Sequence, residues 1–445
     1  MDMTSLIPQF GGALWTLAAF VIALSVIVFV HEYGHYIVGR WSGIKAEVFS
    51  IGFGPVLMSR VDRHGTRWQV AVLPFGGYVK FLGDASAVSD KAGDEIEGMD
   101  AATLRQTMHG APLWARAATV AAGPVFNFIL SILIFAAVIM AQGVPTSPVE
   151  VGVLKPMPNV SQGLQPGDRI LSVGGHEAVD YAGFFEVVNA LPVTPTTEFV
   201  VERGGSRLQV EAPYPFPPIV DALQPGSAAM DAGIEVGDVV TAIDGTPVIA
   251  FRQVQDIVGG SDGRPMKVQI WRDGETLDFV LVPRRADLPT SNGGFETRWL
   301  IGMTGGMMFT AATATPGPLE ALRLGGDQIV YIVTSSLSGL WHMVTGAIST
   351  CNLSGPIGIA ETSGAAASQG ADNFIWFIAV LSTAVGMLNL FPIPVLDGGH
   401  LVFHAFEALT GRPPSDRALR VLMGIGLSLM LGLMVFAVTN DLFCP

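Results

Sequence analysis

The sequence predicts a polytopic α-helical membrane protein with four transmembrane helices, a β-hairpin and two repeated α+β domains outside the membrane. Half of the 445 residues are hydrophobic and only 14% are charged. The mean hydropathy of +0.48 is too high for an ordinary soluble protein. The apolar residues gather in four blocks, each long enough for the ~20 residues that cross a hydrocarbon core. These blocks lie at about 14–38, 115–142, 374–404 and 418–439.

Residues that flank or interrupt the apolar blocks indicate where the four spans begin and end. The first block has no basic residue before it and no small-residue cleavage site after it, so we expect a retained span rather than a secretory signal. Asn389, Pro392 and Pro394 interrupt the third block and predict an irregular end to that span. We expect the four transmembrane helices within residues 1–40, 113–143, 374–410 and 417–440.

The distribution of charge predicts the orientation in the membrane. Lys and Arg are frequent in 40–80 and 412–420, which places these loops on the cytoplasmic side. Residues 2–13 have no Lys or Arg, and 144–320 is markedly acidic, so both termini and the long insert are expected on the outer side. The formal net charge of −14 argues against a nucleic-acid partner.

Two cysteines, Cys351 and Cys444, are too few for a disulfide framework or a thiolate zinc site. Both fall on the expected outer side. We expect two unpaired thiols, with a single bridge between them as the alternative.

A repeat at an offset of 70 residues divides the insert. The segment "GLQPGDRILSVGGHEA" at 163–178 aligns without gaps to "GIEVGDVVTAIDGTPV" at 233–248. Each copy predicts a Gly-Asp turn, an alternating strand, a hairpin turn and a short amphipathic helix. We expect the two domains at 144–215 and 216–290. A connector at 291–373 follows, and its stretch at about 322–350 predicts an amphipathic helix in the membrane interface.

A metal-binding pattern lies at the end of the first span, in "FVHEYGHYIVG" at 29–39. On a helix His31 and His35 share a face, and Glu32 lies beside them. This is the arrangement in which two imidazoles bind Zn²⁺ and a glutamate acts as general base. An ionisable residue in a membrane segment is costly and rarely without function, which favours the metal site.

A third ligand should come from another span at the same depth, because catalytic zinc usually has three protein ligands. His31 lies roughly 25 Å along the first span at about 1.5 Å per residue. In the third span Asp397 reaches a comparable depth, and His400 and His404 are the competing ligands. Four further histidines fall outside the deep spans and are expected to be ordinary surface histidines or histidines with satisfied hydrogen bonds: His64, His109, His176 and His342.

Together, "HEYGH", the later "NLFPIPVLDGG" and the repeated insert resemble the site-2 protease family of intramembrane zinc metalloproteases, in particular the bacterial regulator-of-sigma-E type with tandem PDZ domains. The resemblance implies that His31, His35 and Asp397 bind one zinc ion. It implies Glu32 as general base and Asn389 as a residue that binds substrate. It also implies a membrane-associated β-hairpin at about 48–82, within the loop 41–112, whose edge receives the substrate.

The expected activity is a zinc metalloendopeptidase that cleaves single-span membrane proteins, of the anti-sigma factor type, and possible remnant signal peptides. The resemblance places the protein in the bacterial inner membrane, surrounded by lipid, with both termini and the PDZ-like domains in the periplasm and the active site toward the cytoplasm. The PDZ-like domains are expected either to bind a peptide or to act as a size filter. The first copy lacks a convincing carboxylate-binding loop in "VGVLKPMPNVSQ".

Two other classes of function compete with this one. A catalytically silent scaffold that captures peptides would not need Glu32 and three ligands. A metal transporter would need polar residues at graded depths in several spans, whereas here they gather at one depth.

Overall fold

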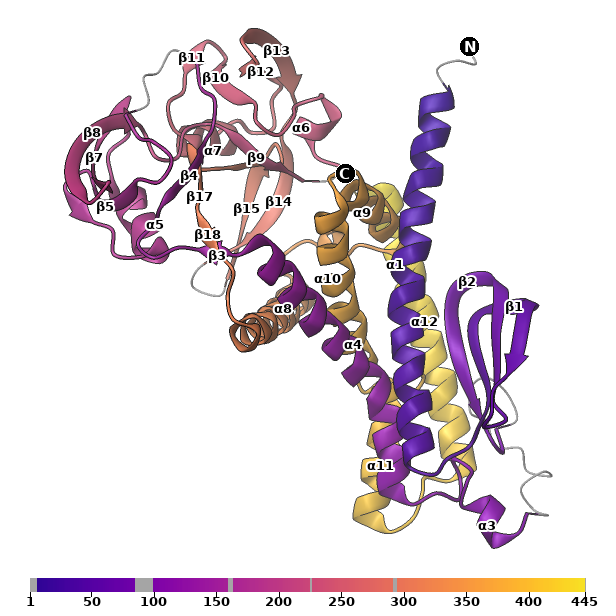
Figure 1. Cartoon of the computed structure of the whole chain (residues 1–445). Coiled ribbons are helices and arrows are strands. Elements are labelled where there is room, and N and C mark those ends of the chain that lie inside the picture. The colour runs from indigo at the N-terminus through magenta and orange to yellow at the C-terminus, as the bar shows by residue number, and fades with distance from the viewer. Residues whose placement is uncertain (1–5, 85–98, 159–162, 225, 291–293, 445) are drawn as a thin grey trace. The chain divides into compact units, whose positions relative to one another are not determined.

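The computed structural model describes residues 6–84, 99–158, 163–224, 226–290 and 294–444, which form two compact units (Figure 1). The first unit consists of Met1–Val138, Leu319–Ser338 and Leu353–Cys444. The second consists of Ile139–Pro318 and Gly339–Asn352. The end of "VGVLKPMPNVSQ", the expected loop of the first repeat copy, lies outside the described residues.

The first unit consists of helices and one β-hairpin. Its helices are α1 (Leu6–Trp41), α3 (Ala101–Leu104), α4 (Leu113–Gln142), α8 (Pro318–Val344), α9 (Pro356–Ser368), α10 (Ala371–Asn389), α11 (Asp397–Thr410) and α12 (Asp416–Phe443), and α4 and α8 extend into the second unit. Among the described residues, four segments are long and apolar enough to cross a membrane: Gly12–Trp41, Leu113–Gln142, Ala371–Asn389 and Asp416–Phe443. This number agrees with the sequence prediction.

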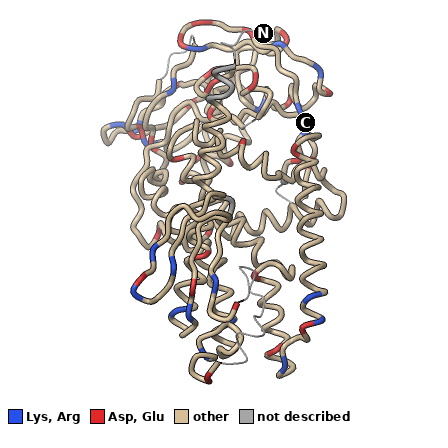
Figure 2. The backbone as a smooth tube through the Cα atoms, turned by 90° about the vertical axis from the view of Figure 1, so that its right-hand side faces the viewer, with Lys and Arg blue, Asp and Glu red and all other residues tan. Residues whose placement is uncertain are grey.

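The distribution of charged residues along α12 also fits a membrane span. In α12, the charged residues stand within the first turns and near the end, at Asp441, and the length between them carries none (Figure 2). An uncharged length of this kind is what a hydrocarbon core requires. Helix α8 is not among the segments apolar enough to span.

The third predicted span, 374–410, is irregular where Asn389, Pro392 and Pro394 predicted it, and the interruption divides it into two helices. Helix α10 ends at Asn389, and a non-helical stretch separates it from α11, which begins at Asp397. Pro392 and Pro394 lie in this stretch, and their missing N–H groups and fixed φ interrupt a continuous helix. Asp397 is therefore placed in the first turn of a new helix.

A long hairpin of β1 (Ala46–Val61) and β2 (Arg67–Phe81) packs against α1 (Figure 1). Buried Phe49 and Val79 of the hairpin share a small core with Tyr36 of α1. At the turn, the Asp62 carboxylate accepts hydrogen bonds from Trp68 Nε1 at 3.0 Å and from the Tyr36 hydroxyl at 3.1 Å. The hairpin is thus attached to α1 at both its strands and its turn.

The Asp62 carboxylate also accepts hydrogen bonds from the backbone N–H groups of His64 and Thr66. Burial acts to raise the pKa of Asp62, but these four hydrogen bonds outweigh it and lower the pKa to about 2. The turn is therefore built around an ionised carboxylate.

The second unit contains the repeat as two four-stranded sheets with the same topology. Their strand orders are β6-β5-β7-β8 and β11-β10-β12-β13. The elements of this unit are β3 (Val144–Pro145), β4 (Val151–Leu154), β5 (Arg169–Val173), β6 (His176–Glu177), α5 (Tyr181–Ala190), β7 (Thr196–Arg203), β8 (Ser206–Pro213), β9 (Val220–Leu223), α6 (Ala228–Asp231), β10 (Val239–Ile243), β11 (Thr246–Pro247), α7 (Phe251–Gly259), β12 (Met266–Arg272), β13 (Glu275–Leu281), β14 (Arg284–Pro289), β15 (Phe295–Leu300), β16 (Met303–Gly305), β17 (Phe309–Ala311) and β18 (Thr313–Ala314). Each copy has its own hydrophobic core.

Strands from the expected connector complete both copies in nested order. Strand β16 pairs with β9 of the second copy, β17 pairs with β4 of the first copy, and β18 pairs with β3 at the start of the insert. Phe309 of β17 is buried in the core of the first copy. The second copy is therefore inserted within the first, and the insert begins and ends at one pair of strands.

Both cysteines are disulfide-bonded, so the expectation of two unpaired thiols was wrong. Cys351 lies in the short 3₁₀-helix Thr350–Asn352, next to which Asp287 accepts hydrogen bonds from Ser349 N and Asn352 Nδ2. Sequence spacing alone carries no information about this pairing.

Candidate metal centre

Two helices of the first unit contribute the ligand-type side chains. His31 and His35 lie one turn apart on α1, so both imidazoles project from one face. Asp397 lies in the first turn of α11. Among the described residues, His31, His35 and Asp397 are the group of ligand-type side chains close enough together to hold a metal ion.

The three candidate ligand atoms converge. His31 Nε2 lies 3.1 Å from Asp397 Oδ2 and 3.2 Å from His35 Nε2, and His35 Nε2 lies 3.5 Å from Asp397 Oδ2. Asp397 Oδ2 is buried and, despite these short distances, accepts no hydrogen bond of acceptable geometry from the described residues. The three ligand atoms therefore lie close enough together to face a common point.

This donor set fits zinc. Imidazole nitrogen and carboxylate oxygen are both zinc ligands, and two atoms bound to one tetrahedral ion at about 2.0–2.2 Å lie roughly 3.3–3.6 Å apart. The observed separations of 3.1 to 3.5 Å are close to this spacing. The three residues would hold the ion and leave one position open, as catalytic zinc sites do.

The sides of the imidazoles that face away from this point are also engaged, in both cases by α4. His35 Nδ1 lies 2.8 Å from the carbonyl oxygen of Thr119. His31 Nδ1 lies 3.2 Å from Asn127 Nδ2. Gly123 lies between them, and a Cβ there would come within 2.4 Å of His35 Nε2 and 2.8 Å of His31 Cε1. Helix α4 can thus approach the histidines only because residue 123 has no side chain.

A cavity of about 380 Å³ opens beside the ligand group. The predicted general base Glu32 and the predicted substrate residue Asn389 both line it. His400 and His404, the competing ligands, line the same cavity but are not part of the group that could hold a metal. All the residues singled out for the site from the sequence therefore meet in one place.

Strand β2 forms part of the wall next to Glu32. A Cβ on Gly77 would lie 3.2 Å from Glu32 Cγ and 3.0 Å from Val28 Cγ1. Gly77 therefore allows the strand to approach α1 closely at the level of the predicted base. Val79 and Phe81, further along β2, also line the cavity.

Sequence reasoning missed several polar residues of this site. Arg116 of α4 forms two hydrogen bonds with the Glu407 carboxylate of α11, at 2.6 and 3.0 Å, and lines the cavity. Asn127 is fully buried beside His31. A buried amide within an apolar span was the available signal, since polar groups inside membrane segments are seldom without a role.

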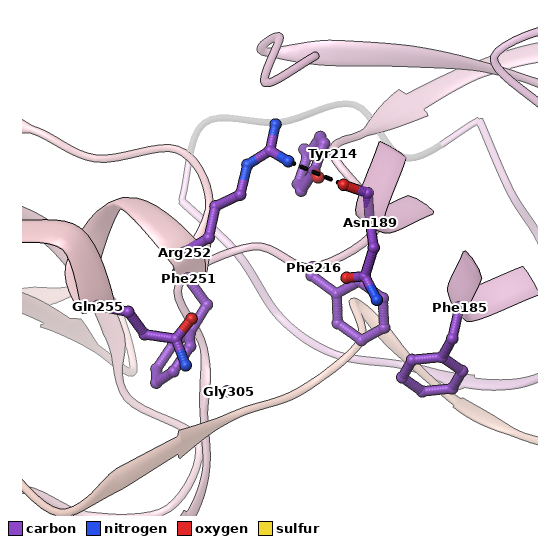
Figure 3. A pocket seen from close by; sticks show the side chains of 8 residues that line it. All are labelled: Phe185, Asn189, Tyr214, Phe216, Phe251, Arg252, Gln255 and Gly305. Carbon is purple, nitrogen blue, oxygen red and sulfur yellow. Dashed lines mark hydrogen bonds between the residues drawn. The ribbon is translucent and has the colours of Figure 1, made fainter. Parts of the chain in front are cut away.

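A second, smaller cavity of about 150 Å³ lies in the second unit, between the helices α5 and α7 of the two repeat copies (Figure 3). Aromatic side chains dominate its wall: Phe185, Tyr214, Phe216 and Phe251. The Arg252 guanidinium lies over the Tyr214 ring and donates hydrogen bonds to the carbonyl oxygens of Asn189 and Leu191. The guanidinium is thus engaged by the end of α5, and the cavity itself is largely apolar.

The fold and the site together define a class of protein, the membrane-embedded metalloproteases. Four candidate spans, an HExxH helix and a converging aspartate from another helix are its components. Comparison with known families gives the particular one: residues 19–433 match the model of Peptidase family M50, and the chain belongs to this family. It is a zinc metalloprotease of the site-2 protease family.

Relatives match over nearly the whole chain. A protein of Agrobacterium fabrum (strain C58), provisionally named a zinc metalloprotease, is 36% identical over 441 residues, which are 99% of this chain and 99% of the relative. The regulator of sigma-E protease RseP of Salmonella typhimurium (strain 14028s) is 33% identical over 463 aligned positions, covering 96% of this chain and 98% of the relative.

Proposed function

We propose that the protein is a zinc-dependent intramembrane endopeptidase with one catalytic ion held by His31, His35 and Asp397. The observation that carries this proposal is the convergence of the three ligand atoms within 3.1 to 3.5 Å beside Glu32, in a cavity between helices. A bound zinc ion supplies Lewis-acid polarisation of the peptide carbonyl and of a water molecule. Glu32 accepts the proton of the attacking water and passes it to the leaving amine.

Asn389 is proposed to bind the substrate near the scissile bond. It lines the cavity from the end of α10, and its Nδ2 donates a hydrogen bond to the carbonyl oxygen of Val385. This hydrogen bond anchors the amide of Asn389 at the end of α10. From there its Oδ1 can accept a hydrogen bond from a peptide N–H of the substrate. The break in the third span supports this role, because it exposes the last turn of α10 to the cavity.

The hairpin β1–β2 is proposed to receive the substrate as an added strand. A transmembrane substrate hides its peptide bonds in helical hydrogen bonds and must unwind before cleavage, and a strand edge can replace those bonds. The close approach of β2 to Glu32 at Gly77 supports this proposal. The alternative, a hairpin that only closes the cavity, would leave cleavage insensitive to changes along the β2 edge.

The proposed substrates are single-span membrane proteins of the anti-sigma factor type, and remnant signal peptides form a second candidate class. The similarity to a relative named regulator of sigma-E protease supports the first class. In the proposed topology the protein lies in the inner membrane, the tandem repeat and both termini are periplasmic, and the cavity is near the cytoplasmic side. The basic loops at 40–80 and 412–420 support this orientation.

The tandem PDZ-like domains are proposed to filter substrates by size or to bind a peptide. The apolar cavity between α5 and α7 can accept an apolar side chain of an extended peptide, which supports binding (Figure 3). The helix α8 is proposed to lie in the membrane interface. Its exposed Leu319, Tyr331 and Trp341 support this placement.

The test of the proposed function is Glu32→Gln in the purified full-length protein, with a single-span anti-sigma factor as substrate in detergent. We expect cleavage to fall at least 100-fold while zinc content stays at one ion per chain, because removal of a general base costs about 10²–10⁴-fold. Glu361→Gln, an exposed glutamate of α9, is the matched control and should retain full activity. Undiminished cleavage by Glu32→Gln would overturn the proposal.

A further inference from the structure

Asn127 is a buried polar side chain that the proposed chemistry does not use. It lies in the middle of α4, within a candidate membrane span, and is 0% exposed. Its Nδ2 is 3.2 Å from His31 Nδ1, and its Oδ1 accepts no hydrogen bond from any described residue. An amide oxygen without a partner in such an environment is costly, so its retention calls for a role.

The two histidines differ in how their distal nitrogens are held. His35 Nδ1 faces the main-chain carbonyl oxygen of Thr119, whereas His31 Nδ1 faces the side chain of Asn127. An imidazole that binds a metal through Nε2 carries its proton on Nδ1, and an acceptor next to that N–H fixes the tautomer and the ring orientation. Only the acceptor for His31 can be altered by mutation of a side chain.

Half a turn of the Asn127 amide about its Cβ–Cγ bond exchanges Oδ1 and Nδ2. The oxygen then faces His31 Nδ1 and accepts a hydrogen bond from its N–H, so the atom that has no partner acquires one. The main chain at this position is fixed independently: the hydroxyls of Ser131 and Ser382 both donate to the carbonyl oxygen of Asn127 at 3.0 Å. The backbone is therefore held to α10 while the amide is directed at α1.

We propose that Asn127 is a positioning residue of the metal site, which holds the His31 ring in the orientation and tautomer that bind zinc through Nε2. This inference rests on the proposed zinc site. Together with Gly123, which leaves room for both imidazoles, Asn127 makes α4 a supporting helix for ligands that belong to α1.

The test is the zinc affinity of the purified full-length protein in detergent, measured by competition with a chromophoric chelator. We expect Asn127→Leu, which keeps the volume but removes the acceptor, to weaken zinc binding about 10–100-fold, the usual cost of losing such a partner. Asn127→Asp retains an acceptor and should bind within about threefold of wild type, as carboxylate–histidine–zinc triads do. Thr383→Val, which removes a buried hydroxyl of α10 that donates to the carbonyl oxygen of Ala379, is the control and should leave zinc affinity unchanged.

The outcomes separate this inference from the proposed function. Wild-type zinc affinity in Asn127→Leu, or equal loss in Asn127→Leu and Asn127→Asp, would overturn the positioning role. Asn127→Ala serves as the second loss variant if leucine prevents folding. If the wild-type protein binds no zinc at all, the proposed function fails, and the inference fails with it.

Discussion

At the scale of single residues, Gly123 shows how closely the metal site is packed. Alanine is favoured over glycine in a helix by about 1 kcal/mol. At this position, however, the added Cβ would lie 2.4 Å from His35 Nε2 and 2.8 Å from His31 Cε1. The two effects have opposite signs, and the contact with ligand atoms should dominate.

We therefore expect Gly123→Ala to lose most of its bound zinc and its proteolytic activity, because the imidazoles must move apart. Zinc content per chain, measured after gel filtration, checks this. Gly432→Ala in α12 is the control, since a Cβ there meets nothing within 4 Å. A Gly123→Ala protein with full zinc content would show that the histidines have more room than the structure gives them.

A second residue-scale feature is a buried ion pair that occurs in both repeat copies. Asp168 is paired in bidentate fashion with Arg203, at 2.6 and 2.7 Å, and Asp238 is paired with Arg272 at 2.7 and 2.7 Å. Both aspartates are essentially unexposed. Each pair raises the pKa of its arginine through the hydrogen bonds to the aspartate. The aspartate in the Gly-Asp of each repeat copy therefore has a structural role.

Removal of one partner from a buried pair leaves a charge without compensation, which costs about 3–5 kcal/mol. We expect Asp168→Asn to lower the free energy of unfolding of the second unit by an amount near the lower end of this range, because Arg203 is partly exposed. Chemical denaturation followed by tryptophan fluorescence measures it. Glu202→Gln, which loosens an exposed pair with Arg169, should cost less than about 0.5 kcal/mol.

At the scale of elements, sequence reasoning was most successful where local pattern decides structure. The four apolar blocks became the four candidate spans, and the repeat became two sheets of the same order. It could not foresee that β16 and β17 complete the two copies, because pairing over about 80 to 160 residues has no local pattern. The arginines that partner Asp168 and Asp238 were missed for the same reason.

The composition of the candidate site could be anticipated from the sequence only in part. His31, Glu32 and His35 follow from spacing on one helix, and depth in the membrane limited the third ligand to Asp397, His400 or His404. The choice of Asp397 came from family resemblance, and the structure brings this residue to the histidines. Asn127 and Arg116 were not foreseen because their partners lie on other helices, and only a three-dimensional arrangement reveals them.

The attachment of the hairpin β1–β2 to α1 can be tested by varying the pH. The pKa of Asp62 is lowered to about 2 from a usual value of 3.8, so ionised Asp62 stabilises the docked turn. A carboxyl with a depressed folded pKa contributes fully above its unfolded pKa and loses this contribution as pH falls through its folded pKa. The stabilisation is therefore present above about pH 4 and is lost between about pH 4 and pH 2.

We expect amide hydrogen exchange in β1 and β2, corrected for intrinsic rates, to accelerate as pH falls through this window. Asp62→Asn should accelerate exchange at neutral pH and show a weaker dependence on pH, because its amide keeps some hydrogen bonds but no charge. Glu47→Gln on the same hairpin, which removes only a partly exposed pair with Lys80, is the control. Equal protection in Asp62→Asn and wild type would contradict the anchoring role of Asp62.

At the scale of the whole molecule, the nested order of strands brings the two ends of the insert together, and Asp287 of the insert also accepts hydrogen bonds from Ser349 and Asn352 beyond it. The insert begins with β3 and ends with β18, and these strands pair with Pro145 opposite Thr313 and Val144 opposite Ala314. Both cores of the repeat are formed by residues that lie between these two paired strands in the sequence. Two chain ends that are already paired can be joined by a two-residue hairpin turn without strain.

We expect a variant in which an Asn-Gly turn replaces residues 146–312 to insert into membranes, retain its zinc and cleave a short single-span substrate, since every residue of the metal centre lies elsewhere in the chain. If the repeat acts as a size filter, this variant should also cleave a substrate that keeps its full outer domain, which the intact protein should reject. If the repeat instead captures a peptide, the variant should cleave both substrates more slowly. Cleavage of the two substrates in parallel, by the intact and the shortened protein, distinguishes the two roles. Unchanged discrimination by the shortened protein would exclude the filter, because no part of the repeat would remain to impose it.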